Sequence, residues 1–185
     1  MAGGLNRKVV TWVHGKLKQR VGRGQGWDLA DRALRQAGAQ SSTTTGTNDD
    51  YVWGKEVPII AVLPGDILQF RDFVVSTVST TEVTFLDGSH YTDIETTVAK
   101  RRHHTAIVVA VSPRRLTIFE QQVKPDEPNV QRHELPIAAG TTTTAARRVL
   151  PTKSGAQKLA AVVTTFTVTI SGRVWAYRPT ASTGN

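Results

Sequence analysis

The sequence of 185 residues contains no cysteine. Disulfide bonds, thiolate metal sites and catalysis by a thiol of this chain are therefore excluded. The absence does not identify a compartment, because proteins of the reducing cytosol and engineered proteins both tolerate it. Any covalent chemistry in this chain needs a different nucleophile.

Long apolar runs are also missing. No stretch of about 18 apolar residues is available to span a bilayer. The opening segment, Met1 to Lys8, lacks the apolar centre of a secretory signal. We therefore expect no membrane insertion and, by default, a cytoplasmic protein.

Acidic residues are fewer than basic ones. Fifteen Asp and Glu stand against 23 Lys and Arg, which gives a formal net charge of +8. This charge favours acidic partners such as nucleic acid, an anionic cell wall or a lipid surface, without choosing among them. The length and the apolar content of 39% suit one well-buried core, so we expect a single monomeric domain over residues 1–185, with a tail at 180–185.

Two amphipathic helices are predicted near the N-terminus. Apolar residues recur every four positions over residues 5–19, which predicts a helix within the first 20 residues. Residues 27–37 show a second helical spacing, with Asp28 suited to its first turn and Gly38 to its end. The following segment, 38–50, is rich in Ser, Thr and Gln and lacks any period, so a flexible surface loop is expected.

Short β-branched runs then predict a series of strands. They cover residues 66–70, 73–78, 83–85, 106–111, 116–119, 130–135 and 174–177. Turn signals separate most of them, at Pro64-Gly65, Asp87-Gly88, Ser112-Pro113 and Ser171-Gly172. Residues 140–165 stay open between loop, helix and strand. Helices followed by consecutive strands predict an α+β fold, with the N-terminal helices packed on an antiparallel sheet or half-barrel.

One predicted hairpin brings a histidine close to a carboxylate. His104 opens the strand that ends near Val111, and the turn at Ser112-Pro113 leads into the next strand. If Val111 pairs with about Leu116, the register places His104 near residues 120–123. Glu120 and this histidine therefore share one rim of the sheet.

The residues on this rim suit proton transfer. Strand alternation places Glu120 and Gln122 on one face and Gln121 on the other. An imidazole can take a proton from a nucleophile and return it to the leaving group, while a carboxylate or an amide fixes its tautomer. A nucleophile at the start of the second helix would gain from the backbone N–H groups there.

Four segments follow one another along the chain: the glycine-rich turn and helix start from Gly22 to Ala30, Pro64-Gly65-Asp66-Ile67-Leu68-Gln69-Phe70, His104-Thr105-Ala106-Ile107-Val108, and Glu120-Gln121-Gln122. In this order they resemble the CHAP family of cysteine/histidine-dependent amidohydrolases and peptidases, which belong with the papain-like cell-wall endopeptidases. In that family the helix opens with Cys-Trp or similar, a Pro-Gly-Asp precedes a strand, a histidine begins a strand, and Glu-x-Asn follows. The resemblance covers residues 20–123, with weaker support from residues 174–179.

The resemblance implies a papain-like, CHAP-like fold and a role for each matching residue. Gly26 stands at the nucleophile's position, His104 at that of the base and Glu120 at that of the orienting carboxylate. Gln122 replaces the family's Asn. The residues expected to line a substrate groove are Gln25, Trp27, Trp53 and Gln121. The resemblance implies no metal and no other cofactor.

The glycine at the nucleophile's position decides the predicted activity. Gly26 has no side-chain atom that could attack a carbonyl carbon. We therefore predict a catalytically inactive domain that retains a cleft for a peptide, a peptidoglycan-like molecule or a protein. The alternative is a cysteine amidase or peptidase whose native nucleophile has been deliberately replaced by Gly26.

Other interpretations of the same residues remain open. Gly22, Gly24 and Gly26 also suit positive φ angles and close helix packing. His103 and His104 could bind zinc together with His90 or His133, although the ligand spacing is not that of a zinc site, and His14 and His133 are otherwise expected at the surface. The basic runs Lys100-Arg101-Arg102, Arg114-Arg115 and Arg147-Arg148 suit nucleic-acid binding, a third and less favoured function, because such pairs are more often solvated strand edges.

Overall fold

The computed structural model describes residues 4–45, 50–124 and 126–182. The chain forms two compact units. Unit 1 consists of Met1–Phe73, Lys100–Ile137 and Ser171–Asn185, and unit 2 of Val74–Ala99 and Ala138–Ile170. This division does not test the prediction of one domain, which stays a prediction. No helix in the described ranges is long and apolar enough to cross a membrane.

Helix α1 (Gly4–His14) is shorter than the sequence predicts. Its buried face includes Val13, in agreement with the four-residue period. The predicted helix over residues 5–19 ends too late, because the chain turns after His14 and Lys18 adopts a left-handed φ of 64°. From that position Lys18 donates its backbone N–H to the carbonyl oxygen of Val130, at 2.9 Å.

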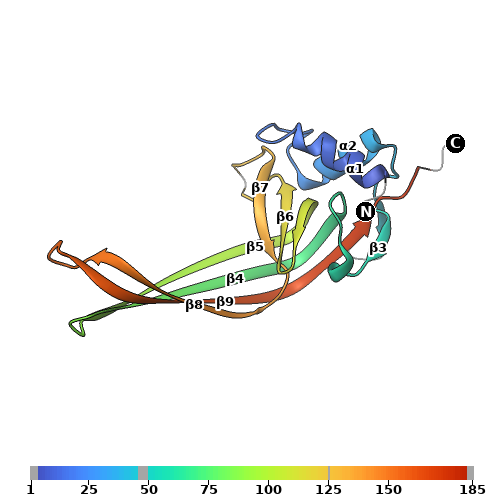
Figure 1. Ribbon diagram of the computed structural model, residues 1–185. Helices are drawn as coiled ribbons and strands as arrows, with labels where there is room; N and C mark the ends of the chain where they lie inside the picture. The colour runs from blue at the N-terminus through green and yellow to red at the C-terminus, as the bar shows by residue number, and fades with distance from the viewer. Residues whose placement is uncertain (1–3, 46–49, 125, 183–185) are drawn as a thin grey trace. The chain divides into compact units, whose positions relative to one another are not determined.

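Helix α2 (Gly26–Ala37) confirms the second predicted helix. Gly38 ends it in the left-handed conformation, with a φ of 76°, and donates its N–H to the carbonyl oxygens of Leu34 and Arg35. The side chains of α2 that face the core are Leu29, Ala30, Ala33, Leu34 and Ala37. The two helices lie side by side next to the ends of β5 and β6 (Figure 1).

Seven strands form the main sheet. They are β3 (Lys55–Val57), β4 (Ile67–Phe85), β5 (His90–Ser112), β6 (Arg115–Glu120), β7 (Gln131–Pro136), β8 (Gly140–Pro151) and β9 (Gln157–Arg178). The order is β3-β9-β4-β5-β6-β7, and β8 pairs with β9. The pairs β3–β9, β5–β6, β6–β7 and β8–β9 are antiparallel. Two helices with a largely antiparallel sheet confirm the α+β class.

The hairpin of β5 and β6 starts in the predicted register, but a β-bulge between Val108 and Ala110 shifts the pairing by one residue. Val111 pairs with Leu116, and Ile107 pairs with Phe119. Both members of the second pair are buried in the core of unit 1, together with Trp53 and the inner faces of α1 and α2. A short 3-10 helix, η1 (Ile59–Ala61), precedes β4.

The predicted loop at 38–50 is wrong in part. Strand β1 (Thr43–Thr45) pairs antiparallel with β2 (Asp50–Val52), while residues 46–49 lie outside the described residues. Ala39 forms an isolated antiparallel bridge with Ala181. Ala181 lies in the predicted tail, so the first part of that tail is paired with the rest of the chain. The end of that tail, residues 183–185, is outside the described chain. The bridge of Ala39 is a long-range contact, whereas β1 and β2 are close in the chain and pair with each other although their sequence shows no strand pattern.

The turn predicted at Ser171-Gly172 is also wrong, because β9 continues through both residues. Gly172 has a φ of 82°, and a β-carbon there would overlap the carbonyl oxygen of Asp72. Asp72 itself has a φ of 47°. Glycine at this position therefore permits a close approach of two backbones within unit 1 and does not end the strand.

Unit 2 is built from strands only. It holds the end of β4, the beginning of β5, β8 and most of β9. Residues 140–165, left open by the sequence, form β8 and part of β9, whose pairing runs from Gly140 opposite Val168 to Pro151 opposite Gln157. The small core of this unit consists of Val83, Phe85, Ala160 and Val162, with Leu150 packed against it.

Candidate functional site

The turn that leads into α2 is held by two buried side chains. Gln121 accepts the N–H of Val21 at 3.1 Å and donates to the carbonyl oxygens of Val21 at 3.0 Å and Gln25 at 2.6 Å. Asp28, in the first turn of α2, accepts the backbone N–H of Arg23 at 2.9 Å. Gly22 and Gly24 have φ angles of 60° and 92°, as the structural interpretation of these glycines expects. The hydrogen bonds of Gln121 and Asp28 therefore fix the turn from which α2 begins.

Gly26 begins α2 against the backbone of β5. A β-carbon on residue 26 would overlap the carbonyl oxygen of Thr105 and would lie 3.3 Å from its carbonyl carbon and its amide nitrogen. Gly26 is buried, and its φ is not in the left-handed region. Glycine is needed here because a backbone atom of the neighbouring strand occupies the space that a side chain would fill.

His104 lies beside Glu120, as the hairpin register predicts. The Nε2 atom of His104 is 3.1 Å from Oε2 of Glu120. With Nε2 directed to the carboxylate, Nδ1 is the nitrogen left for a group in the neighbouring pocket. The imidazole ring is mostly buried, with 12% of its side chain exposed, whereas the carboxylate is completely buried.

Two further basic side chains beside Glu120 were not predicted. The guanidinium of Arg101 donates from Nε to Oε2 at 2.9 Å and from Nη2 to Oε1 at 2.5 Å. His133 was expected at the surface; 37% of its side chain is exposed, yet its Nδ1 lies 2.9 Å from Oε1 of the buried carboxylate. The β6–β7 pairing explains this contact, because it sets Glu120 opposite Gln131, and His133, two positions further, shares its face.

This environment lowers the pKa of Glu120. Burial by itself would raise the pKa, but the hydrogen bonds of Arg101, the close approach of His104 and His133 and the charge of Arg101 outweigh it and hold the pKa well below 4.5. The distances of both imidazole nitrogens are those of ion pairs, yet neither forms an aligned hydrogen bond, and Nη1 of Arg101 is also buried without one. The bidentate Arg101 contact is therefore the strongest single interaction of the carboxylate.

A polar pocket lies between the start of α2 and β5. Its volume is about 290 Å³, and its lining comprises Gln25, Gly26, Trp27, Tyr51, His103, His104, Thr105 and Gln122. The structure thus brings the predicted residues Gln25, Gly26, Trp27, His104 and Gln122 to one place. We call this pocket the Gly26 cleft. Glu120 lies behind His104 and is not part of its wall.

Gln122 reaches the cleft in a different way from the predicted strand alternation. Strand β6 ends at Glu120, and Gln122 follows with a left-handed φ of 58°. Its backbone N–H donates to the carbonyl oxygen of Glu127 at 3.0 Å. The turn, rather than the pleat of a strand, therefore decides where this exposed amide lies.

Trp53 and Gln121 do not line the cleft. Both side chains are fully buried. Trp53 donates its indole N–H to Oε1 of Gln69 at 3.3 Å, and Gln121 uses its amide on the turn before α2. The prediction that these two side chains line a substrate groove is therefore wrong; both stabilise the interior of unit 1.

Aromatic side chains form one wall of the cleft. The ring of Trp27 lies 6.3 Å from that of Tyr51, which lies 5.3 Å from the ring of His103. The indole N–H of Trp27 donates to Oγ of Ser42 at 3.0 Å. His103 was missed as a lining residue, and Tyr51 lines the cleft in place of its neighbour Trp53, which was expected there.

No arrangement of three or more His, Asp or Glu side chains that could hold a metal ion is present in the described part of the chain. His104 and His133 do approach the same carboxylate. Both oxygens of that carboxylate are already bonded to Arg101, however, so a cation occupies the position that a metal would need. A zinc site at these histidines therefore has no support in the described residues.

Comparison with known proteins gives one match. A family model described as the AIM3/BBC1 cysteine proteinase-fold domain matches residues 2–184. No curated protein and no solved structure matches the chain. The match extends over nearly the whole sequence and agrees with the papain-like resemblance of the segments around Gly26 and His104. The chain therefore belongs to the AIM3/BBC1 cysteine proteinase-fold domain family.

Proposed function

We propose that this chain is a non-catalytic member of the papain-like fold that binds an extended peptide segment, free or as part of a protein, in the Gly26 cleft. The overlap between a β-carbon at residue 26 and the carbonyl oxygen of Thr105 carries the proposal. The backbone has closed over the position that a nucleophile would occupy. Catalysis by a side chain there is excluded, while the neighbouring polar surface remains open.

The lining of the cleft suits a peptide. Gln25 and Gln122 are exposed amides, which can both donate to and accept from a peptide backbone. Trp27 and Tyr51 add flat apolar surface for a side chain. His104, supported by Glu120 through Nε2, adds a third polar group. This combination of a few placed polar groups and an aromatic wall is typical of ligand sites.

A native cysteine at position 26 is the enzyme-derived alternative, and the packing disfavours it. The overlapping atom belongs to the backbone of β5, which cannot rotate away as a flexible side chain would. A thiol at residue 26 would therefore require α2 or β5 to move. The nucleic-acid alternative also loses support, because Arg101 of the first basic run is buried in its ion pair with Glu120.

A peptide-display selection tests the proposal. A random peptide library is selected against the wild-type chain, and the affinities of the enriched peptides are measured for two variants. Gln25→Arg adds a large side chain at the mouth of the cleft while keeping the backbone bonds of Gln25. Gln157→Arg makes the same change at an exposed glutamine of β9 outside the cleft. Peptides that lose binding only with Gln25→Arg support the proposal.

Two results would overturn it. One is a selection whose peptides bind both variants as well as the wild type. The other is cleavage of casein or of a peptide amide by the purified chain at a rate that the His104→Ala variant abolishes. The first would place ligand binding elsewhere, and the second would mean that the cleft catalyses without a thiol.

A further inference from the structure

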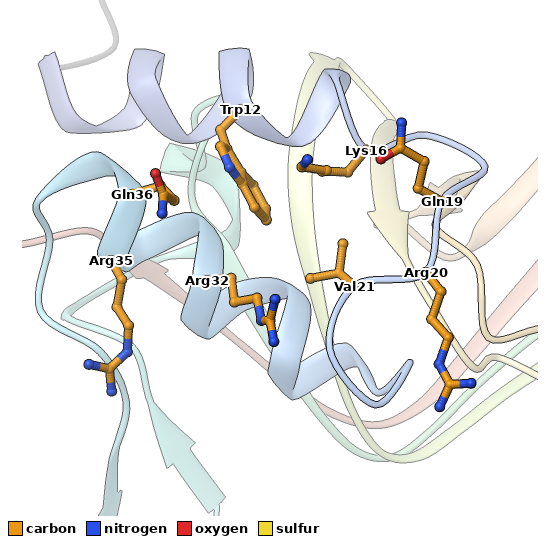
Figure 2. Close-up of a pocket in the computed structure, with 8 residues that line it drawn as sticks. All are labelled: Trp12, Lys16, Gln19, Arg20, Val21, Arg32, Arg35 and Gln36. Carbon is orange, nitrogen blue, oxygen red and sulfur yellow. The ribbon is translucent and has the colours of Figure 1, made fainter.

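A second pocket in unit 1 shares no residue with the Gly26 cleft. It has a volume of about 490 Å³ and lies between α1, the turn that follows α1, and α2 (Figure 2). Its lining comprises Trp12, Lys16, Gln19, Arg20, Val21, Arg32, Arg35 and Gln36. We call it the basic pocket, since four of these eight side chains are cationic and none is acidic.

Three of the four cations, Lys16, Arg20 and Arg32, have no carboxylate partner in the described part of the chain. Lys16 lies over the ring of Trp12, 5.4 Å from its centre, and no ion pair is found for Lys16 or Arg32. Arg35 is bonded to Asp31 at 2.9 Å, and Arg20 donates to the backbone oxygen of Arg23 at 2.6 Å. The pocket therefore keeps an unbalanced positive charge that an anionic ligand would neutralise.

The cations are distributed along the pocket and do not surround one point. Figure 2 shows Arg35 and Arg20 at opposite ends, with Lys16 and Arg32 between them. Trp12 projects from α1 between the two helices, and its half-buried indole offers an apolar surface. A ligand that matches this arrangement carries several negative charges spaced along a narrow chain and has apolar atoms between them.

We propose that the basic pocket binds an acidic peptide segment of a partner protein, rich in Asp and Glu. The amides of Gln19 and Gln36 suit the backbone of such a segment. A peptide strand fits a recess between two helices, whereas a nucleic-acid duplex or a lipid surface meets a protein over a broad face. The proposal is independent of the Gly26 cleft.

The test uses a short fluorescent peptide of alternating Glu and Gly, with the same peptide carrying Gln in place of Glu as its neutral control. Binding to the full chain is followed by fluorescence anisotropy at low and at high salt. Arg32→Glu reverses one unpaired charge inside the pocket. Arg7→Glu is the matched control, because Arg7 is an exposed residue of α1 outside the pocket and changes the net charge equally. Circular dichroism verifies that both variants keep their helices.

The expected result is salt-sensitive binding of the Glu peptide and none of the Gln peptide. Arg32→Glu is expected to weaken that binding about tenfold or more, because it places like charges in contact, while Arg7→Glu changes it little. Lys16→Glu is a second pocket variant and should act like Arg32→Glu. Equal weakening by Arg32→Glu and Arg7→Glu would overturn the proposal in favour of unspecific attraction.

Two competitors decide whether the ligand class is right. A DNA duplex and vesicles of phosphatidylserine are each tested for displacement of the bound Glu peptide. The proposal expects the Glu peptide to bind more tightly than either competitor at equal charge concentration. Tighter binding of DNA or of vesicles, lost in Arg32→Glu but not in Arg7→Glu, would assign the pocket to that other class. No binding of the Glu peptide at low salt would also refute the proposal.

Discussion

The carbonyl oxygen of Thr105 occupies the space that a β-carbon on Gly26 would need. The backbones of α2 and β5 therefore approach each other more closely here than any residue with a β-carbon would allow. A side chain on residue 26 therefore has no room beside β5. The first prediction follows from this close approach.

Gly26→Ala is expected to destabilise the protein by about 1–3 kcal/mol, since the added methyl group forces α2 and β5 apart. Gly26→Cys should cost at least as much and should not produce amide hydrolysis. Urea unfolding, followed by tryptophan fluorescence, gives the free energies. Gly4→Ala is the matched control: nothing lies within 4 Å of a β-carbon at Gly4 in α1, so little or no loss is expected. A stable Gly26→Cys protein with a reactive thiol would contradict the proposed closure.

Glu120→Gln is expected to cost about 3–5 kcal/mol, because it leaves the Arg101 guanidinium buried without a counter-charge. The control is Glu134→Gln, which removes an exposed partner of Arg132 and should cost no more than about 1 kcal/mol. Thermal and urea unfolding of both variants give the comparison. Equal effects of the two substitutions would mean that the buried cluster contributes no more than a surface ion pair.

The low pKa of Glu120 predicts a loss of stability in acid. Above pH 4.5 the carboxylate is ionised in both the folded and the unfolded chain, and its stabilisation is fully present. As the pH falls below 4.5, the unfolded chain takes up a proton first, so the free energy of unfolding decreases until the pH has passed through the lower pKa of the folded state. Unfolding measured across this range should be less pH-dependent in Glu120→Gln.

Asp87 is a second carboxyl group with a lowered pKa, so its contribution to the loss of stability in acid has to be separated from that of Glu120. Hydrogen bonds from Lys158 and Ser89 also lower the pKa of Asp87, but this residue is exposed in unit 2. Repeating the titration with Asp87→Asn at high salt separates the two groups, because salt screens an exposed ion pair far more than a buried one. The acid sensitivity that remains should belong to Glu120.

The phenol of Tyr177 should ionise at a higher pH in the folded chain than in the unfolded chain. Burial, followed by the charges of Glu56 and Asp50, raises the pKa of its phenol from 10.0 to about 12. The stabilisation is therefore complete below pH 10 and is lost as the pH rises towards 12, because only the unfolded chain releases the proton in that range. The ultraviolet absorbance of tyrosinate, compared between the wild type and Tyr177→Phe, measures this step. A difference spectrum already complete near pH 10 would contradict it.

Gln121→Leu should loosen the turn before α2. The change leaves the N–H of Val21 and the carbonyl oxygens of Val21 and Gln25 without their partner, for a loss of about 2 kcal/mol or more. Faster hydrogen exchange of the Val21 amide would locate the effect. Gln122→Leu, one residue further at an exposed position, serves as the control and should leave this amide protected.

Local patterns in the sequence were sufficient for several parts of the site. The helical spacing over residues 27–37 and the glycine after it predicted α2, because apolar periodicity and a left-handed end are short-range properties. The tight turn at Ser112-Pro113 set the pairing of Val111 with Leu116, which predicted His104 near the end of β6. The bulge between Val108 and Ala110 was not predicted, and it turns His104 to the face of Glu120. The strand pairing next to a tight turn depends on only a few residues, so it could be predicted from the sequence.

Other features depended on segments far apart in the chain. Strand β8 is exposed along nearly its whole length, so it has no alternation of apolar residues that would have identified it. The burial of Trp53 and Gln121 followed from what packs over them, and Gly172 proved to be a point of close backbone approach instead of a turn. The identity of a residue alone does not tell whether a tryptophan or glutamine is buried, or whether a glycine forms a turn or a close backbone contact.

The sequence by itself determined that this chain supplies no thiol and that His104 and Glu120 lie at one rim of the sheet, because composition and the pairing next to a tight turn are local facts. Only the tertiary structure decided that Arg101 and His133 join the same carboxylate and that Thr105 closes the space at Gly26. Both of these depend on how α2, β5 and β7 pack together, and packing is set by long-range contacts that no short stretch of sequence encodes.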